Sequence, residues 1–219
     1  MLSFIKKYAK DEFSQNGEDG ILQEIIDRLG IEKGTVVEFG AHNGLYCSNS
    51  RRLILKEWSA VLIECDDNLY KQLFALYKKA SDLSFTKPGH KLYNVTLNHR
   101  AVTPQNVNEL LPAEIDILSI DVDGMDILIW DAYAGKAKVV VIEINSSLDP
   151  MSTVQDYARQ GASYSAMYTV GMLKAYMLVG HCGNLIFVRE EYRHLFPELH
   201  GTHPIRDIDL YFNRSWQKS

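Results

Sequence analysis

Five short apolar runs, each separated from the next by enough residues for a helix, constrain the fold of this chain more than any other feature. The runs are residues 35–39, 60–63, 91–97, 115–120 and 139–144. Helical patterns lie between them at 50–58, 69–79, 104–111 and 125–133, with Thr103 as a candidate helix cap. Continuous apolar strands joined by crossover helices are typical of a parallel sheet covered on both faces. The sequence therefore predicts an α/β fold.

Further patterns precede and follow these units. Residues 21–29 have apolar positions at helical spacing, come after a polar segment at 14–19, and end at Gly30. A helical pattern at 164–174 is followed by the runs 176–179 and 185–188, which a short turn-like segment joins. Two such runs are typical of a β-hairpin. We therefore expect seven strands, with the last one antiparallel to its neighbours.

Composition favours a single domain. The chain has 219 residues, 46% of them hydrophobic, and no Pro/Gly/Ser-rich linker divides it. We expect one domain over 1–219, made of an N-terminal lid and helix segment (1–30), a core (31–190) and a C-terminal tail (191–219). The net charge of −5, with both signs interspersed, gives no electrostatic footprint for nucleic acid.

The cysteines and the hydropathy of the chain indicate the cellular compartment in which the protein is expected. Cys47, Cys65 and Cys182 share no C-x-x-C spacing and leave an odd thiol, so neither a disulfide framework nor a structural zinc site is indicated. The N-terminus lacks signal-peptide character, and no run approaches the roughly 20 apolar residues of a membrane span. We expect a cytoplasmic protein without membrane insertion. The sequence leaves open whether it forms a homodimer.

Two strand ends carry the outline of a nucleoside pocket. The first run leads into a loop with Gly40 and Gly44, and the second ends at Glu64 and Asp66. Glycines let the backbone approach a ligand, and a carboxylate at the next strand end can accept both hydroxyls of a ribose. A G-x-G-x-x-G dinucleotide fingerprint would need glycines at positions 42 and 45, where this loop has His42 and Leu45. NAD is therefore disfavoured.

Five sequence blocks, in this order, resemble the FkbM-type group of class I S-adenosylmethionine-dependent methyltransferases. They are residues 14–20 (SQNGEDG), 37–44 (VEFGAHNG), 119–124 (SIDVDG), 140–145 (VVIEIN) and 161–163 (GAS). The resemblance covers roughly residues 12–190 and implies a Rossmann-like sheet of order 3-2-1-4-5-7-6. It implies S-adenosylmethionine as cofactor and O-methylation of a sugar, a glycan precursor or a small polar metabolite.

The resemblance also implies cofactor contacts. Gln15 and Glu18 would lie over the amino-acid end of the cofactor, Glu38 near its methionine part, and the segment after the third strand around adenine. The expected cofactor-binding residues are Gln15, Glu18, Glu38, Gly40, Ala41, Asn43, Gly44, Glu64, Cys65, Asp66, Arg100, Ala101 and Asp121. Other readings stay open, because Glu38 could cap a strand end and Arg100 could be a surface cation.

Chemistry is expected at the end of the fourth strand. Asp121 and Asp123 lie at the edge where open α/β sheets bind ligands, and a carboxylate there could take the proton of an accepting hydroxyl. His42 is a third candidate for proton transfer. Alternatively, Asp121, Glu143 and Asn145 could hold a divalent cation such as Mg²⁺. Asp126 could simply cap the following helix.

Three rival functions remain. One is an N-methyltransferase acting on a small acceptor, another is a NAD-dependent oxidoreductase, and the third is a nucleoside-binding module without turnover. The acceptor is expected to be a small or sugar-like molecule. Its recognition would come from the N-terminal segment, the loop after Asn145 and the C-terminal tail.

Overall fold

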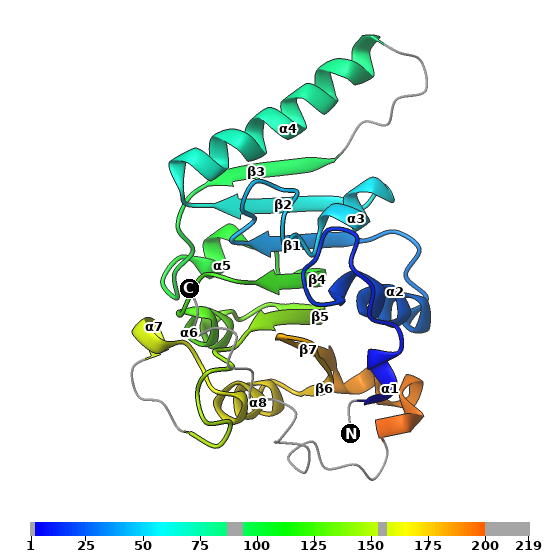
Figure 1. Ribbon diagram of the computed structural model, residues 1–219, viewed down its shortest axis with the longest axis vertical. Helices are drawn as coiled ribbons and strands as arrows, with labels where there is room; N and C mark the ends of the chain where they lie inside the picture. The colour runs from blue at the N-terminus through cyan, green and yellow to red at the C-terminus, as the bar shows by residue number, and fades with distance from the viewer. Residues whose placement is uncertain (1–2, 87–93, 153–156, 200–219) are drawn as a thin grey trace.

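A computed structural model of the chain describes residues 3–86, 94–152 and 157–199. These residues contain a seven-stranded sheet of order β3-β2-β1-β4-β5-β7-β6 (Figure 1). Strand β7 is antiparallel to β5 and β6, and the remaining neighbours are parallel. The predicted order and the antiparallel final strand are therefore confirmed. The strands are β1 (Thr35–Phe39), β2 (Ser59–Glu64), β3 (Val95–His99), β4 (Glu114–Ile120), β5 (Lys136–Glu143), β6 (Tyr176–His181) and β7 (Asn184–Arg189).

Helices connect the parallel strands, as expected from the sequence. Helix α4 runs along the β3 edge of the sheet, and α8 lies near the opposite edge, by β6 (Figure 1). The helices are α1 (Ser3–Lys6), α2 (Glu18–Leu29), α3 (Arg51–Leu55), α4 (Asp67–Thr86), α5 (Val107–Leu110), α6 (Asp126–Ala132), α7 (Tyr157–Gln160) and α8 (Tyr164–Leu173), followed by the 3₁₀ helices η1 (Glu190–Leu195) and η2 (Pro197–Leu199).

Two helices are shorter than the sequence predicts. Helix α3 ends at Leu55 because Glu57 adopts a φ of 68° and Trp58 turns into the core. Thr103 as a helix cap is wrong. Its amide is bound instead by the Asn106 side chain at 2.8 Å, which forms a turn before α5 begins at Val107. Local side chain to backbone bonds of this kind compete with the helix.

Parts of two predicted segments lie outside the described residues. The third strand was expected from residue 91, and residues 91–93 are not described. The same holds for residues 200–219 of the predicted tail. The described part of the tail packs on the domain, because Phe196 is fully buried and Glu198 accepts hydrogen bonds from Arg28.

The strands bury their side chains on both faces. Residues 139–142 of β5 and 185–188 of β7 are almost completely inaccessible. This burial explains why these strands read as unbroken apolar runs in the sequence. Among the described residues, no helix combines the length and the apolar character that crossing a membrane requires.

The ends of β1 and β4 meet at Gly40. Strand β1 pairs with β4 through Phe39 and Ile120, so the two following loops leave the sheet side by side. Gly40 has a φ of 65°, and a β-carbon there would lie 1.8 Å from the carbonyl oxygen of Asp121. That distance is far below any tolerable contact. Glycine is thus required for these two loops to approach each other.

Replacing this glycine tests the close approach. Gly40→Ala should lower the free energy of unfolding by about 3 kcal/mol, because it adds both backbone strain and a collision with Asp121. Gly30→Ala is the matched control: Gly30 also has a left-handed φ, 66°, but nothing lies within 4 Å of its β-carbon position. We expect that control to lose only about 1 kcal/mol in urea denaturation. Equal losses would contradict the role of the Asp121 contact.

Candidate functional site

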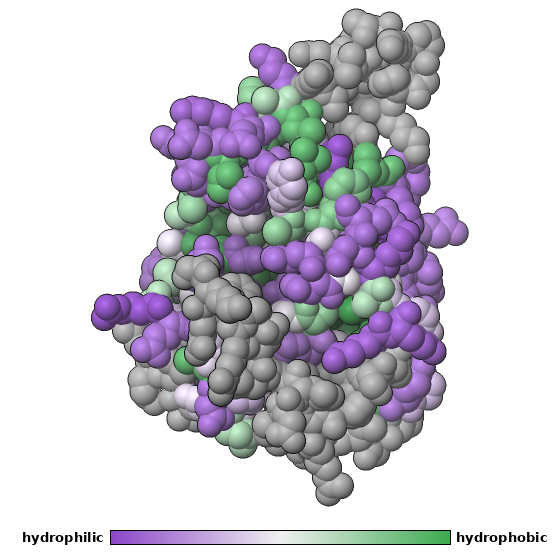
Figure 2. All heavy atoms as spheres, in the orientation of Figure 1, coloured by the Kyte–Doolittle hydropathy of each residue, from purple (hydrophilic) through white to green (hydrophobic). Residues whose placement is uncertain are grey.

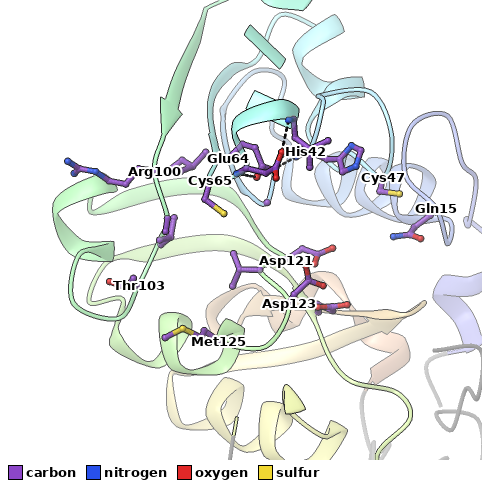
Figure 3. Close-up of a pocket in the computed structure, with 18 residues that line it drawn as sticks. Gln15, His42, Cys47, Glu64, Cys65, Arg100, Thr103, Asp121, Asp123 and Met125 are labelled. Atoms are coloured by element: carbon purple, nitrogen blue, oxygen red, sulfur yellow. Dashed lines mark hydrogen bonds between the residues drawn. The ribbon is translucent and has the colours of Figure 1, made fainter. Parts of the chain in front are cut away.

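A cavity of about 630 Å³ opens at the carboxyl edge of the parallel strands. Its lining comes from residues that follow or end β1 to β5 and from the segment before α2, and Figure 3 shows ten of its residues labelled around a common space. Open α/β sheets bind ligands at this edge. The lining residues are Gln15, Gly40, His42, Cys47, Ile63, Glu64, Cys65, Asp66, Leu69, Arg100, Ala101, Val102, Thr103, Asp121, Val122, Asp123, Met125 and Glu143.

Glu64 organises the upper wall of the cavity in Figure 3. One of its carboxylate oxygens accepts the His42 amide at 2.8 Å, and the other accepts the Asp66 amide at 2.8 Å. The side chain is only 5% exposed, yet it lines the cavity. Each carboxylate oxygen has a second lone pair. The carboxylate is therefore fixed in place and can still accept hydroxyl donors from a ligand.

Part of the cavity lining is apolar. The apolar lining residues include Ile63, Leu69, Val102 and Met125. In Figure 3 the Arg100 side chain points away from the cavity, and its backbone amide binds the Glu64 carbonyl at 3.1 Å. The sequence reasoning named Arg100 and Ala101 but missed the two residues that follow. The apolar Val102 directly after the polar strand end was the available signal.

Polar groups line another part of the cavity. Gln15 and Cys47 both line it, on the same side of the view in Figure 3. The segment before Gln15 is held by Asp19, whose Oδ2 accepts the amides of residues 12–14 at 2.7 to 2.9 Å. Glu18 lies outside the lining: it accepts the Asn16 amide and the Asn184 side chain, which ties α2 to the β6–β7 turn.

Glu38 lies beneath the cavity rather than in its wall. Its carboxylate accepts hydrogen bonds from the Ser48 hydroxyl, the Ser50 hydroxyl and the Asn49 amide, at 2.5 to 2.9 Å. Full burial raises the pKa of Glu38 to about 7. Glu38 thus anchors the segment after Cys47 to β1, and its expected contact with the cofactor stays a prediction.

The remaining glycine-loop residues shape the loop. Ala41 is 1% exposed, and its amide binds the Ile63 carbonyl. The Asn43 side chain accepts the amides of Leu45 and Tyr46, both at 3.1 Å. Gly44 packs against α4 with a φ of 75°. These three residues are not among the lining residues, whereas His42 is.

His42 sits at the turn between β1 and β2. Its φ of 49° lets its backbone amide reach Glu64. Its buried Nδ1 has no hydrogen-bond partner among the described residues. An imidazole nitrogen that is unengaged inside a cavity can exchange hydrogen bonds or a proton with a ligand.

The lower wall carries a cluster of three carboxyl groups. Ligand oxygens of Asp121, Asp123 and Glu143 lie within 4.8 Å of one another. Burial raises the pKa values of Asp121 and Glu143, neighbouring carboxylates raise them further, and a hydrogen bond joins the two groups. The pair therefore keeps a proton at pH values where an exposed carboxyl group has lost it.

Asp126 positions this cluster. Its two carboxylate oxygens accept the amides of Val122 and Gly124 at 2.8 and 2.9 Å. Asp123 and Gly124 both have positive φ values, 56° and 132°. The turn after β4 is therefore held by the first residue of α6. Asp126 as the cap of that helix is wrong, because its carboxylate binds amides before the helix and Met125 is the N-cap.

The same three carboxyl groups could hold a metal ion. Among the described residues, they form the group of acidic, histidine or cysteine side chains close enough together to do so. Hard oxygen ligands suit Mg²⁺. Asn145 was expected as a further ligand, and that role stays a prediction. Its side-chain NH₂ donates to the Gln160 carbonyl at 2.7 Å, and its side-chain oxygen accepts the Ser147 amide at 3.0 Å.

In the orientation of Figure 1, hydrophobic residues gather between hydrophilic ones at the level of β2, β1 and β4 (Figure 2).

The three cysteines are free, and Cys47 and Cys65 line the cavity. Burial, as the largest cause, raises the pKa of both thiols. Neither thiol is therefore activated as a nucleophile.

No family model and no curated protein matches this chain. Solved structures do match. Monomeric WbdD is 15% identical, with 83% of this chain and 42% of WbdD covered and a TM-score of 0.54. TehB from Haemophilus influenzae is 12% identical, with 76% and 62% covered and a TM-score of 0.50. The methyltransferase domain of bacterial CtHen1-C is 10% identical, with 80% and 99% covered and a TM-score of 0.50.

These likenesses establish the fold. The chain has the Rossmann-like class I methyltransferase fold, with the strand order that the sequence predicts. It spans less than two thirds of WbdD and of TehB. What it acts on must be argued from its own cavity.

The buried Glu38 gives a test of the site's architecture. Between pH 4.5, the usual pKa, and about 7, the folded protein holds a proton on Glu38 that the unfolded chain has released. Its contribution to stability is thus full below pH 4.5 and is lost as the pH rises through 7. Glu38→Gln mimics the protonated form and should remove up to roughly 3 kcal/mol of this pH dependence.

Urea denaturation of both proteins across this pH range measures the effect. The exposed Glu32→Gln is the control and should follow the wild type at each pH. A Glu38→Gln protein with the same pH dependence as the wild type would contradict the protonation of Glu38 in the folded state.

Proposed function

We propose that this protein is an S-adenosylmethionine-dependent methyltransferase that methylates an oxygen of a small polar or sugar-like acceptor. One observation carries the proposal: the cavity lies at the carboxyl ends of β1, β2 and β4 in a sheet of methyltransferase order, with the fixed carboxylate of Glu64 at the end of β2. The sequence resemblance to FkbM-type methyltransferases supports the same function, and membership of that group is part of the proposal.

The lining fits an adenosyl compound in three places. Glu64 offers the acceptor oxygens that a ribose diol needs, and the apolar lining residues Val102 and Met125 suit a flat base. Gln15 offers an amide for an amino-acid moiety. Gly40 lets the loops after β1 and β4 approach each other at the cavity, because a β-carbon there would collide with the Asp121 carbonyl oxygen.

S-adenosylmethionine supplies a methyl group on a sulfonium: the acceptor oxygen forms the new C–O bond while the C–S bond breaks and its electron pair stays on sulfur. The protein must align the acceptor and take its hydroxyl proton. The Asp121–Glu143 pair can take it, because its raised pKa values suit proton exchange near neutrality. Asp123 adds negative charge beside the pair.

Each rival function predicts a different binding result. A NAD-dependent oxidoreductase would bind NAD and not S-adenosylhomocysteine, whereas a binding module would bind the latter without turnover. An N-methyltransferase would share the cofactor and prefer amines. Binding of a divalent cation remains a prediction. Calorimetric titrations of the protein with S-adenosylhomocysteine, with and without Mg²⁺, test it.

Glu64→Ala should weaken the binding of S-adenosylhomocysteine about 100-fold, because it removes charged hydrogen bonds to the ribose and releases the His42 amide. Isothermal titration calorimetry measures the change. Asp67→Ala, an exposed carboxylate two positions beyond the lining residue Cys65, is the control and should bind as the wild type. Binding of NAD but not of S-adenosylhomocysteine by the wild type would overturn the proposed function.

Asp121→Asn should bind S-adenosylhomocysteine within a few-fold of the wild type and lose about 100-fold or more of its turnover, since a general base of this kind is removed. Transfer of a radiolabelled methyl group to acceptors measures turnover. Asp131→Asn, in α6 and away from this cavity, is the matched control. Full activity of Asp121→Asn would exclude Asp121 as the base.

A further inference from the structure

A second, smaller cavity adjoins the candidate cofactor site. Its volume is about 190 Å³, and it shares Asp123 and Glu143 with the larger cavity. Molecules in the two cavities would therefore meet at these two carboxyl groups. The other residues that line it are Gly124, Asp126, Ile144, Asn145, Ser147, Arg159, Gln160, Gly161 and Ala162.

The lining of the smaller cavity suits a ligand rich in hydroxyl groups. Ser147, Arg159 and Gln160 are polar residues of its lining, in addition to the shared carboxyl groups. The Ser147 hydroxyl donates to the Asn145 side-chain oxygen and can still accept a hydrogen bond. No aromatic side chain is among its described lining residues. Polyols are recognised by several directional hydrogen bonds, whereas flat aromatic acceptors need apolar walls. A volume of about 190 Å³ is sufficient for one ring-sized group.

The walls are fixed before any ligand binds. The Asn145 side chain joins the loop after β5 to α7 through the Gln160 carbonyl, and its backbone amide binds the Ala162 carbonyl at 2.9 Å. Gly161 has a φ of 66°, and a β-carbon there would lie 3.3 Å from Asn145. Such an arrangement positions a ligand at little entropic cost.

Resting on the methyltransferase function proposed above, we propose that the smaller cavity is the acceptor site, that it takes a single sugar-like ring, and that Ser147 and Gln160 determine which ring is accepted. The reacting hydroxyl then lies between Asp123 and Glu143, at the boundary with the cofactor cavity. Its proton passes to the Asp121–Glu143 pair as its oxygen takes the methyl group.

Saturation-transfer NMR of the full chain tests the site without relying on turnover. The probes are methyl glucoside, methyl galactoside, methyl mannoside and myo-inositol, each with and without S-adenosylhomocysteine. Gln160→Trp and Ser147→Phe place bulk into the cavity from two walls. Ala158→Trp is the matched control, because Ala158 is exposed on the same helix, α7, and does not line the cavity.

We expect at least one ring to bind the wild type and the control, and both cavity variants to bind it about tenfold more weakly. All four proteins should bind S-adenosylhomocysteine equally. If that compound binds but no ring does, or if both cavity variants bind rings as the wild type does, the acceptor site is overturned while the proposed function stands. Failure of S-adenosylhomocysteine to bind the wild type would overturn the function itself.

Discussion

Buried carboxylates that accept backbone amides hold the carboxyl edge of this sheet together. A loop that leaves a buried strand exposes amides that cost free energy unless they are bound. Glu38 and Glu64 bind amides of the loop after β1, Asp126 binds amides of the loop after β4, and Asp19 binds amides of the segment before α2. Each carboxylate is almost fully buried. The shape of the cavity therefore depends on carboxyl groups that the core keeps in fixed positions, and only some of them face the cavity.

The difference between carboxyl groups that face the cavity and those that only bind backbone explains which parts of the site the sequence could predict. A carboxylate directly after an apolar run marks a strand end, so Glu64 and Asp121 were found from local pattern. Whether such a carboxylate faces a ligand or binds backbone amides depends on which loop, from another part of the sequence, packs against it. Glu38 and Ser48 are ten residues apart, and Glu18 and Asn184 are far apart in sequence. No local pattern contains that information.

The fold was more predictable than the site for a related reason. Apolar runs such as those of β4 and β5 are continuous because both faces of the strands are buried, and burial alone sets that pattern. The ends of helices were less predictable. Asn106 redirected the chain before α5, and the left-handed Glu57 ended the segment after α3. A single side chain to backbone contact set the first boundary, and a single left-handed residue set the second.

The charge of the cavity separates the candidate cofactors more sharply than the glycine pattern does. Five of its lining residues are acidic, namely Glu64, Asp66, Asp121, Asp123 and Glu143, and the lining stays acidic when the Asp121–Glu143 pair keeps one proton. The guanidinium of Arg100 points away from them (Figure 3). A pyrophosphate would bring two negative charges into this partly buried field, where repulsion is poorly screened. A sulfonium brings a positive charge to the same place and is attracted by it. The electrostatics of the described residues therefore favour S-adenosylmethionine over a dinucleotide, independently of any motif.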